Sequence, residues 1–293
     1  MCTSIRWKWS KSDERRVSMK SFHRRAAKPP PAPQARATES TDRGGLYRID
    51  SLMVERGYAP SRTAAQRMIA KGRVSVDGEP IHKAAMACPS NAEIAVEPAE
   101  DDRYVSRGGL KLAGALAHTG LEVSGMSCLD VGQSTGGFTD CLLQAGAAHV
   151  TGIEVGHDQL HPRLRNDPRV RCREGINART LAPADFDELY PEAGFDLIVC
   201  DASFISLTLL MPQWPALLAE RGHVIALVKP QFEVGPGGLG KGGIVTDTSR
   251  YAEVERKIHQ CAHRCGLEVV DFFNSPITGG DGNREFFIHA TRA

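Results

Sequence analysis

The sequence predicts an α/β protein in which a Rossmann-like, mostly parallel sheet follows a smaller α+β domain. Two apolar runs of strand length, 195–200 and 223–228, each end directly at a charged residue. A third run, 127–131, enters a Gly-rich turn before a helix, as at the ligand-binding edge of such sheets. With 293 residues the chain has room for one large domain and a smaller one.

Residues 1–45 are expected to form a disordered basic tail. They contain 11 Lys and Arg against 4 Asp and Glu, include the Pro-rich stretch 28–33, and lack helical or strand periodicity. The tail is either a basic arm that contacts nucleic acid or a solvated leader, with Met19 as an alternative start.

The smaller domain is expected at 46–98. Ile49, Leu52 and Met53 share one face of a helix, and a second helix is predicted from Ser61 to Lys71 with Ser61 as its N-cap. Alternation at 74–76 predicts a strand, and the following Asp-Gly pair predicts a hairpin turn. The expected module is two helices followed by a small sheet.

Basic side chains cluster on the second helix and at its exit. They are Arg62, Arg67, Lys71 and Arg73. Such a cluster can bind successive phosphates of a nucleic acid, and it is also compatible with a solvated helix face.

After a linker at 99–106, the large domain is expected at 107–293. The Gly-rich turn from Gly132 to Gly137 allows the backbone to approach a ligand and points helix N–H groups at it. The next strand, 149–153, ends at Glu154, which can accept hydrogen bonds from ribose hydroxyls. The turn matches neither the dinucleotide fingerprint nor a phosphate loop, so S-adenosylmethionine is the favoured nucleoside cofactor.

Four charged residues are predicted to meet at one edge of the sheet. Asp201 and Lys229 follow the strands 195–200 and 223–228 directly. Glu285 opens the last strand, 285–290, and reaches the same edge if that strand is an antiparallel edge strand. Lys111 follows a Gly pair at the head of the helix before the first strand. The alternative is a set of unrelated surface ion pairs.

Composition argues against several other classes of protein. With 41% hydrophobic and 24% charged residues the chain is typical of a globular protein, and it has neither an apolar run of membrane-spanning length nor the apolar core of a signal peptide. We therefore expect it in the cytoplasm. The eight Cys form no C-x-x-C pair, which indicates reduced thiols, and no metal site is expected.

The smaller domain resembles the RNA-binding domain named after ribosomal small-subunit protein four. The matching residues are Arg48-Ile49-Asp50, Ser61-Arg62 with Ala65, and Gly72-Arg73-Val74 through Gly78. The resemblance implies an RNA partner. The expected RNA-binding residues are Arg48, Ser61, Arg62, Arg67, Lys71 and Arg73.

Residues 46–293 as a whole resemble the TlyA (hemolysin A) family of ribosomal RNA 2'-O-ribose methyltransferases, whose catalytic half is FtsJ-like. The matching stretches are 106–112, 130–139, 201–207, 228–233, 240–243 and 282–287. This family implies a seven-stranded methyltransferase sheet with an antiparallel edge strand.

The family's Lys-Asp-Lys-Glu tetrad falls on Lys111, Asp201, Lys229 and Glu285. The residues expected to bind S-adenosylmethionine are Asp130, Gly132, Ser134, Thr135, Gly136, Gly137, Glu154 and Asn177. The resemblance implies methylation of a ribose 2'-hydroxyl, on a cytidine, in ribosomal RNA or a ribosomal subunit. A monomer is the default expectation, because the sequence does not indicate an oligomeric state. The alternative is a ribosome-assembly factor that binds RNA without methyl transfer; membrane lysis is disfavoured because 6–28 lacks an apolar face.

In our hypothesis Lys229 is the base that accepts the proton of the 2'-hydroxyl. An ammonium group becomes a base at neutral pH when burial and a second cation favour its neutral form, and Lys111 would supply that cation. Asp201 and Glu285 would orient the two amines, whose roles are exchangeable. Phe204 and Phe232 either stack on the target base or belong to the core.

Two further segments bear on the site. The Gly-rich segment 235–243 is expected to be a lid or an RNA-contact loop. His157-Asp158 stands where the family has Tyr-Gly, which is either a change in the wall of the cofactor pocket or a polar loop substitution.

Overall fold

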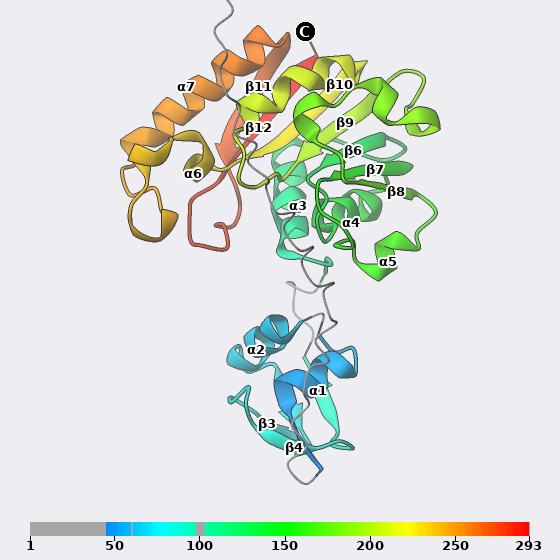
Figure 1. Ribbon diagram of the computed structural model, residues 1–293, viewed down its shortest axis with the longest axis vertical. Helices are drawn as coiled ribbons and strands as arrows, with labels where there is room; N and C mark the ends of the chain where they lie inside the picture. The colour runs from blue at the N-terminus through cyan, green and yellow to red at the C-terminus, as the bar shows by residue number, and fades with distance from the viewer. Residues whose placement is uncertain (1–44, 60, 98–102, 293) are drawn as a thin grey trace, which may run out of the picture. The chain divides into compact units, whose positions relative to one another are not determined.

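The computed structural model describes residues 45–59, 61–97 and 103–292, and these divide into two compact units with the boundary in the sequence between Val96 and Glu97 (Figure 1). The expectations for residues 1–44 of the tail and for residues 99–102 of the linker lie outside the described residues. Within the described ranges, no helix combines the length and apolar character needed to cross a membrane.

The N-terminal unit contains two helices and short antiparallel strands. The helices are α1 (Ile49–Glu55) and α2 (Arg62–Ala70), and the strands are β1 (Leu46–Arg48), β2 (Val74–Val76), β3 (Glu79–Pro80), β4 (Ala87–Pro89) and β5 (Ile94–Val96). β2 pairs with β3 and β5, and β1 pairs with β4. The predicted N-cap is confirmed, because the amide of Ala64 donates to Ser61 Oγ at 3.2 Å.

A fully buried carboxylate, Asp50, connects the two helices of this unit. It accepts hydrogen bonds from Arg48 at 2.8 and 3.0 Å, from Arg62 at 3.1 Å and from Gln66 at 2.8 Å. Burial by itself would raise the pKa of Asp50, but the bonds from Arg48, Gln66 and Arg62 outweigh it and hold the pKa well below its ordinary value. The carboxylate therefore stays ionised inside the unit.

The C-terminal unit is built on one seven-stranded sheet, as expected. In sheet order the strands are β11 (Leu267–Asn274), β12 (Phe286–Arg292), β10 (Leu218–Val228), β9 (Phe195–Cys200), β6 (Ser127–Val131), β7 (His149–Glu154) and β8 (Val170–Glu174). All pairs from β10 to β8 are parallel. β12 is the antiparallel strand and lies between β10 and the outermost strand β11.

Helices cover both faces of this sheet (Figure 1). They are α3 (Arg107–Thr119), α4 (Gly137–Gln144), α5 (Pro162–Arg165), α6 (Pro230–Glu233) and α7 (Ser249–Arg264). Leu197 and Val199 of β9 pack into the core that includes α3 and α4, whereas the alternate residues Ile198 and Cys200 pack into the core that includes α7. The strands are therefore apolar on both faces, as parallel strands between two helical layers require.

The thiols agree with the expectation of reduced cysteines. The seven Cys of the described residues are all free, and five of them are buried. Across the described ranges, His, Cys, Asp and Glu form no group of three or more suited to a metal ion.

We predict that Asp50→Asn destabilises the N-terminal unit by about 1–3 kcal/mol at pH 7, because an amide leaves part of the donor set without an acceptor. Native-state hydrogen exchange of the core amides of Met53 and Ile69 in the full chain measures this. Since folding lowers the pKa of Asp50, the wild-type advantage is complete above about pH 4 and is lost below it. Glu55→Gln, which changes an exposed carboxylate of α1, is the control; equal protection in both variants would contradict the prediction.

Candidate active site

The four tetrad residues form two ion pairs at one cavity. Lys111 Nζ lies 2.6 Å from Glu285 Oε2, and Lys229 Nζ lies 2.7 Å from Asp201 Oδ1. Both lysines and Glu285 are buried, and all four residues line the same cavity of about 550 Å³. The structure thus brings together charges that are up to 174 positions apart in the sequence.

Local structure explains where the first lysine lies. Helix α3 begins at Arg107 and carries Lys111 one turn later. A Cβ on Gly109 would lie 2.3 Å from the ring of Tyr104, so only glycine allows this close packing at the start of the helix. Gly108 faces the cavity, with its Cβ position 3.6 Å from Asp201 Oδ2. The Gly pair lets the helix start approach the end of β9.

Lys229 has a larger set of acceptors than the sequence indicated. Its Nζ donates to Ser203 Oγ at 2.7 Å and to the carbonyl of Asp201 at 3.3 Å, in addition to its ion pair. The Asp201 amide donates to Val131 O at 3.2 Å, which attaches this loop to β6. Sequence reasoning missed Ser203; its position two residues after Asp201 in a matching stretch was the available signal.

The Gly-rich turn forms one wall of the cavity. Gly132, Ser134, Thr135 and Gly137 are lining residues. Gly132 has a φ of 83°, and its Cβ position is 3.0 Å from Ala202 Cα, so the turn lies directly against the loop after β9. Gly136 lies outside the lining and faces α5, with its Cβ position 2.4 Å from Leu164 Cδ1.

Glu154 lies behind this wall rather than among the lining residues. Its Oε2 accepts from the Ser134 amide at 2.9 Å, and its Oε1 accepts from the Gly156 amide at 2.8 Å. The carboxylate therefore fixes the turn, and each oxygen keeps a second lone pair for another donor.

Asp130 is fully enclosed below the turn. Its Oδ2 accepts from the amide and hydroxyl of Thr139 at 3.0 and 2.7 Å, while no protein group donates to its Oδ1. Burial raises the pKa of Asp130 to about 7; the charges of Asp201 and Glu154 act in the same direction, and the bonds from Thr139 oppose them. Asn177 is exposed, caps a short 3₁₀ turn through the Arg179 amide at 3.0 Å, and lies outside the cavity lining.

The opposite rim of the cavity is aromatic and glycine-rich. Phe204 is 91% exposed, so the core alternative is wrong for this residue. Its ring centroid lies 5.3 Å from that of Phe232, and both rings line the cavity. Leu239, Gly242 and Gly243 of the Gly-rich segment complete this side.

The loop with His157 and Asp158 packs on the end of β8. The Asp158 amide donates to Glu174 Oε1 at 2.9 Å, and His157 Nδ1 lies 3.6 Å from Glu174 Oε2. Both residues are exposed, and neither is a lining residue of the cavity.

The expected RNA-binding residues occupy three kinds of position in the N-terminal unit. Arg48 and Arg62 are held by Asp50, with 44% and 50% of their side chains exposed. Ser61 caps α2. The remaining three are the exposed Arg67 and Lys71 and the half-buried Arg73.

Two family models match the chain, one for each unit. The S4 domain matches residues 48–94, and the FtsJ-like methyltransferase matches residues 104–292. The first range includes both helices and the strands β2, β3 and β4 of the first unit, and the second range includes the whole seven-stranded sheet.

Individual proteins match over most of both units. The 16S/23S rRNA (cytidine-2'-O)-methyltransferase TlyA of Mycobacterium tuberculosis is 42% identical over 82% of this chain and 88% of its own length. A putative rRNA methyltransferase of Bacillus subtilis is also 42% identical, over 83% of this chain and 84% of its own. The structure of a putative hemolysin from Streptococcus thermophilus, 39% identical, superposes with a TM-score of 0.67 over 85% of this chain and 89% of that one. The chain belongs to the TlyA (hemolysin A) family, with an S4 domain before an FtsJ-like methyltransferase domain.

Proposed function

We propose that this chain is an S-adenosylmethionine-dependent methyltransferase that methylates the ribose 2'-hydroxyl of a cytidine in ribosomal RNA. The observation that carries the proposal is the pair of buried Lys–carboxylate contacts, Lys111–Glu285 and Lys229–Asp201, at a cavity bounded by the Gly-rich turn. The cytidine and the ribosomal substrate are inferred from the relative in Mycobacterium tuberculosis. We place the reaction in the cytoplasm and assign it to a monomer.

The residues present fit S-adenosylmethionine. The turn at Gly132 leaves no room for a side chain and presents backbone at the cavity wall, beside the start of α4. Glu154 retains acceptor capacity for ribose hydroxyls next to Ser134. Both lining lysines are already paired with carboxylates, so the cavity offers no unpaired lysine to a pyrophosphate. When bound, S-adenosylmethionine supplies an electrophilic methyl group.

The side chains of the chain itself handle the proton of the 2'-hydroxyl. Lys229 Nζ accepts that proton, and Asp201 stabilises the ammonium that results. The acceptors at Ser203 and Asp201 hold Nζ at one point of the cavity. Lys111, held by Glu285, orients the ribose and supplies the second positive charge, and the two lysines can exchange roles. Alignment of the hydroxyl supplies most of the remaining acceleration.

Phe204 is placed to stack on the target base. A bare aromatic ring at the rim of a cavity is an unfavourable exposure of apolar surface that a nucleobase would cover. Its φ of 63° lies in the left-handed region, which turns the ring out of the loop.

The N-terminal unit, residues 46–98 in our proposal, supplies affinity for RNA. Arg48 and Arg62 are oriented by the shared Asp50, so their half-exposed guanidinium groups form a fixed pair for phosphates. Residues 107–293 carry more Asp and Glu than Lys and Arg, 22 against 17, which disfavours the approach of RNA to that unit by itself.

Lys229→Met is expected to lower methyl transfer to purified ribosomal subunits at least about 100-fold, because the proton acceptor is lost. Labelled methyl incorporation into ribose measures this, and cofactor binding should change less than about twofold. Arg169→Met, which breaks a surface ion pair with Asp167, is the control. Transfer at the wild-type rate in Lys229→Met would refute the role; a wild type that binds the cofactor yet methylates no RNA would indicate an assembly factor.

Glu154→Gln is expected to weaken S-adenosylmethionine binding about tenfold, since its side-chain amide has one acceptor oxygen and cannot hold both the Ser134 and the Gly156 amides as the carboxylate does. Isothermal titration calorimetry measures the change. Glu174→Gln is the matched variant at the end of the neighbouring strand and should bind normally. A tenfold loss in Glu174→Gln as well would mean that the loop with His157 and Asp158 forms part of the cofactor pocket.

The double variant Arg62→Gln, Arg67→Gln should bind ribosomal RNA more weakly and reduce the slope of log affinity against log salt by about 1 to 2, one for each lost phosphate contact. Filter binding at several salt concentrations measures the slope. Arg171→Gln, at an exposed position of the other unit, is the control. An unchanged salt slope in the double variant would exclude α2 from the RNA interface.

A further inference from the structure

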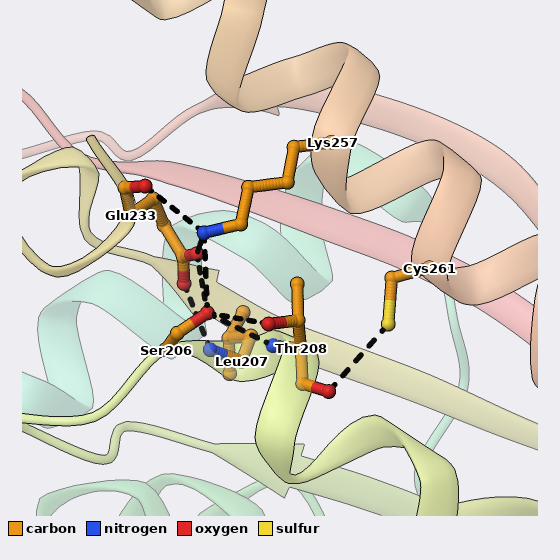
Figure 2. A network of polar contacts seen from close by, with 6 residues as sticks. All are labelled: Ser206, Leu207, Thr208, Glu233, Lys257 and Cys261. Atoms are coloured by element: carbon orange, nitrogen blue, oxygen red, sulfur yellow. Dashed lines mark hydrogen bonds and ion pairs between the residues drawn. The ribbon is translucent and has the colours of Figure 1, made fainter. Parts of the chain in front are cut away.

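Another buried carboxylate, Glu233, lies outside the lining of the cavity and joins the two loops that carry Asp201 and Lys229. Its side chain is 1% exposed and is not among the residues that line the cavity. Figure 2 shows the side chain pointing toward the start of the segment Ser206–Thr208, with Lys257 of α7 on its other side. Glu233 therefore lies away from the surface that a substrate would contact. Its hydrogen bonds nevertheless connect the loop that carries Lys229 with the loop that carries Asp201.

Both oxygens of the Glu233 carboxylate accept hydrogen bonds from the surrounding protein. Oε1 accepts from the Leu207 amide at 2.8 Å, and Oε2 accepts from Ser206 Oγ at 2.6 Å. Lys257 Nζ donates to Oε2 at 2.7 Å and to the Glu233 carbonyl at 2.9 Å. These bonds come from three segments of the chain, so the network is tertiary (Figure 2).

These bonds close a ring that passes through the ion pair. Lys229 is the residue before α6, and Glu233 is the last residue of that four-residue helix. Glu233 is hydrogen-bonded to Ser206, which lies five residues after Asp201 in the sequence. Asp201 and Ser203 contact Lys229 Nζ, and this contact completes the ring. Both covalent arms of the ring are short, so the position of Glu233 limits the separation of Lys229 from Asp201.

The two chain segments of this ring, 201–206 and 229–233, also carry the two phenylalanines at the rim of the cavity. Phe204 lies between Asp201 and Ser206, and Phe232 directly precedes Glu233 in the sequence. Their ring centroids lie 5.3 Å apart, and the hydrogen bonds of the Glu233 carboxylate connect the two segments that carry these rings. A buried carboxylate stabilises a fold no better than a well-packed apolar group would, so its value lies in the geometry that it imposes.

We propose that Glu233 is a positioning residue that sets the spacing of the Lys229–Asp201 pair and of the two phenylalanines, with Lys257 as its counter-ion. The inference deepens the proposed function and rests on it. In this proposal the bonds from Ser206 and Leu207 maintain the spacing of the catalytic groups, whereas the bond from Lys257 neutralises the buried charge of Glu233.

Two variants separate the positioning role from a merely structural one. Glu233→Gln keeps one acceptor for the Leu207 amide but cannot also accept from Ser206 and Lys257. Lys257→Met removes the ion pair and the longer bond, 3.4 Å, from Lys257 Nζ to Ser206 Oγ, but it leaves in place the bonds that Glu233 accepts from Ser206 and Leu207. A structural cross-link between α7 and the sheet would be damaged equally by both changes.

In the full chain, Glu233→Gln is expected to lower kcat for methyl transfer to ribosomal subunits about tenfold or more, because small displacements of reacting groups cost large factors in rate. Its pH profile for kcat should shift, since the distance between Lys229 and Asp201 changes. Affinity for S-adenosylmethionine should remain within about twofold, because Glu233 does not contact the Gly-rich turn. Lys257→Met should keep kcat within about threefold of the wild type while lowering Tm.

An unchanged kcat and pH profile in Glu233→Gln would overturn the proposal, and so would an equal loss of kcat in both variants. If Glu233→Gln does not fold, Ser206→Ala removes one donor from the same carboxylate without a change of charge. It should lower kcat about threefold and leave cofactor affinity unchanged, and wild-type kcat in Ser206→Ala would then overturn the proposal. A wild type without methyl transfer would instead contradict the proposed function.

Discussion

The contact between Lys229 and Asp201 is the constraint around which the catalytic unit is organised. β9 and β10 are neighbouring parallel strands, so the residues that follow them emerge side by side at one edge of the sheet. A buried ammonium group requires acceptors, and Asp201 and Ser203 supply them from one loop. That loop is in turn attached to β6 and held by Glu233, so the surrounding contacts serve to keep one ion pair in place.

Several carboxylates lie at this edge of the sheet, and their environments give them different structural roles. Glu154 accepts from the Ser134 amide of the turn and from the Gly156 amide after β7, whereas Asp130 is enclosed and has a pKa raised to about 7. Because folding raises the pKa of Asp130, its contribution to stability is complete below the unfolded pKa of about 4 and is lost as the pH rises toward 7. A protonated Asp130 also reduces the negative charge that lies behind the cofactor wall.

Each unit contains a buried carboxylate that several hydrogen-bond donors stabilise, but the two carboxylates position different groups. In the N-terminal unit Asp50 holds Arg48 and Arg62, whose side chains remain half exposed. In the catalytic unit Glu233 gathers Ser206, Leu207 and Lys257 and stays away from the cavity. In both cases several donors from separate elements stabilise one charge, and the geometry of the neighbouring functional groups follows from it.

The sequence by itself determined the strands β6 and β9, the Gly-rich turn and the meeting of Lys111, Asp201, Lys229 and Glu285, because apolar runs fix strand ends and sheet topology brings those ends together. It left open which lysine pairs with which carboxylate. Only the tertiary structure decided that, as it decided the roles of Ser203 and Glu233, the outermost position of β11 and the placement of Glu154 behind the turn. These depend on side-chain directions between segments that are distant in sequence, which no local periodicity encodes.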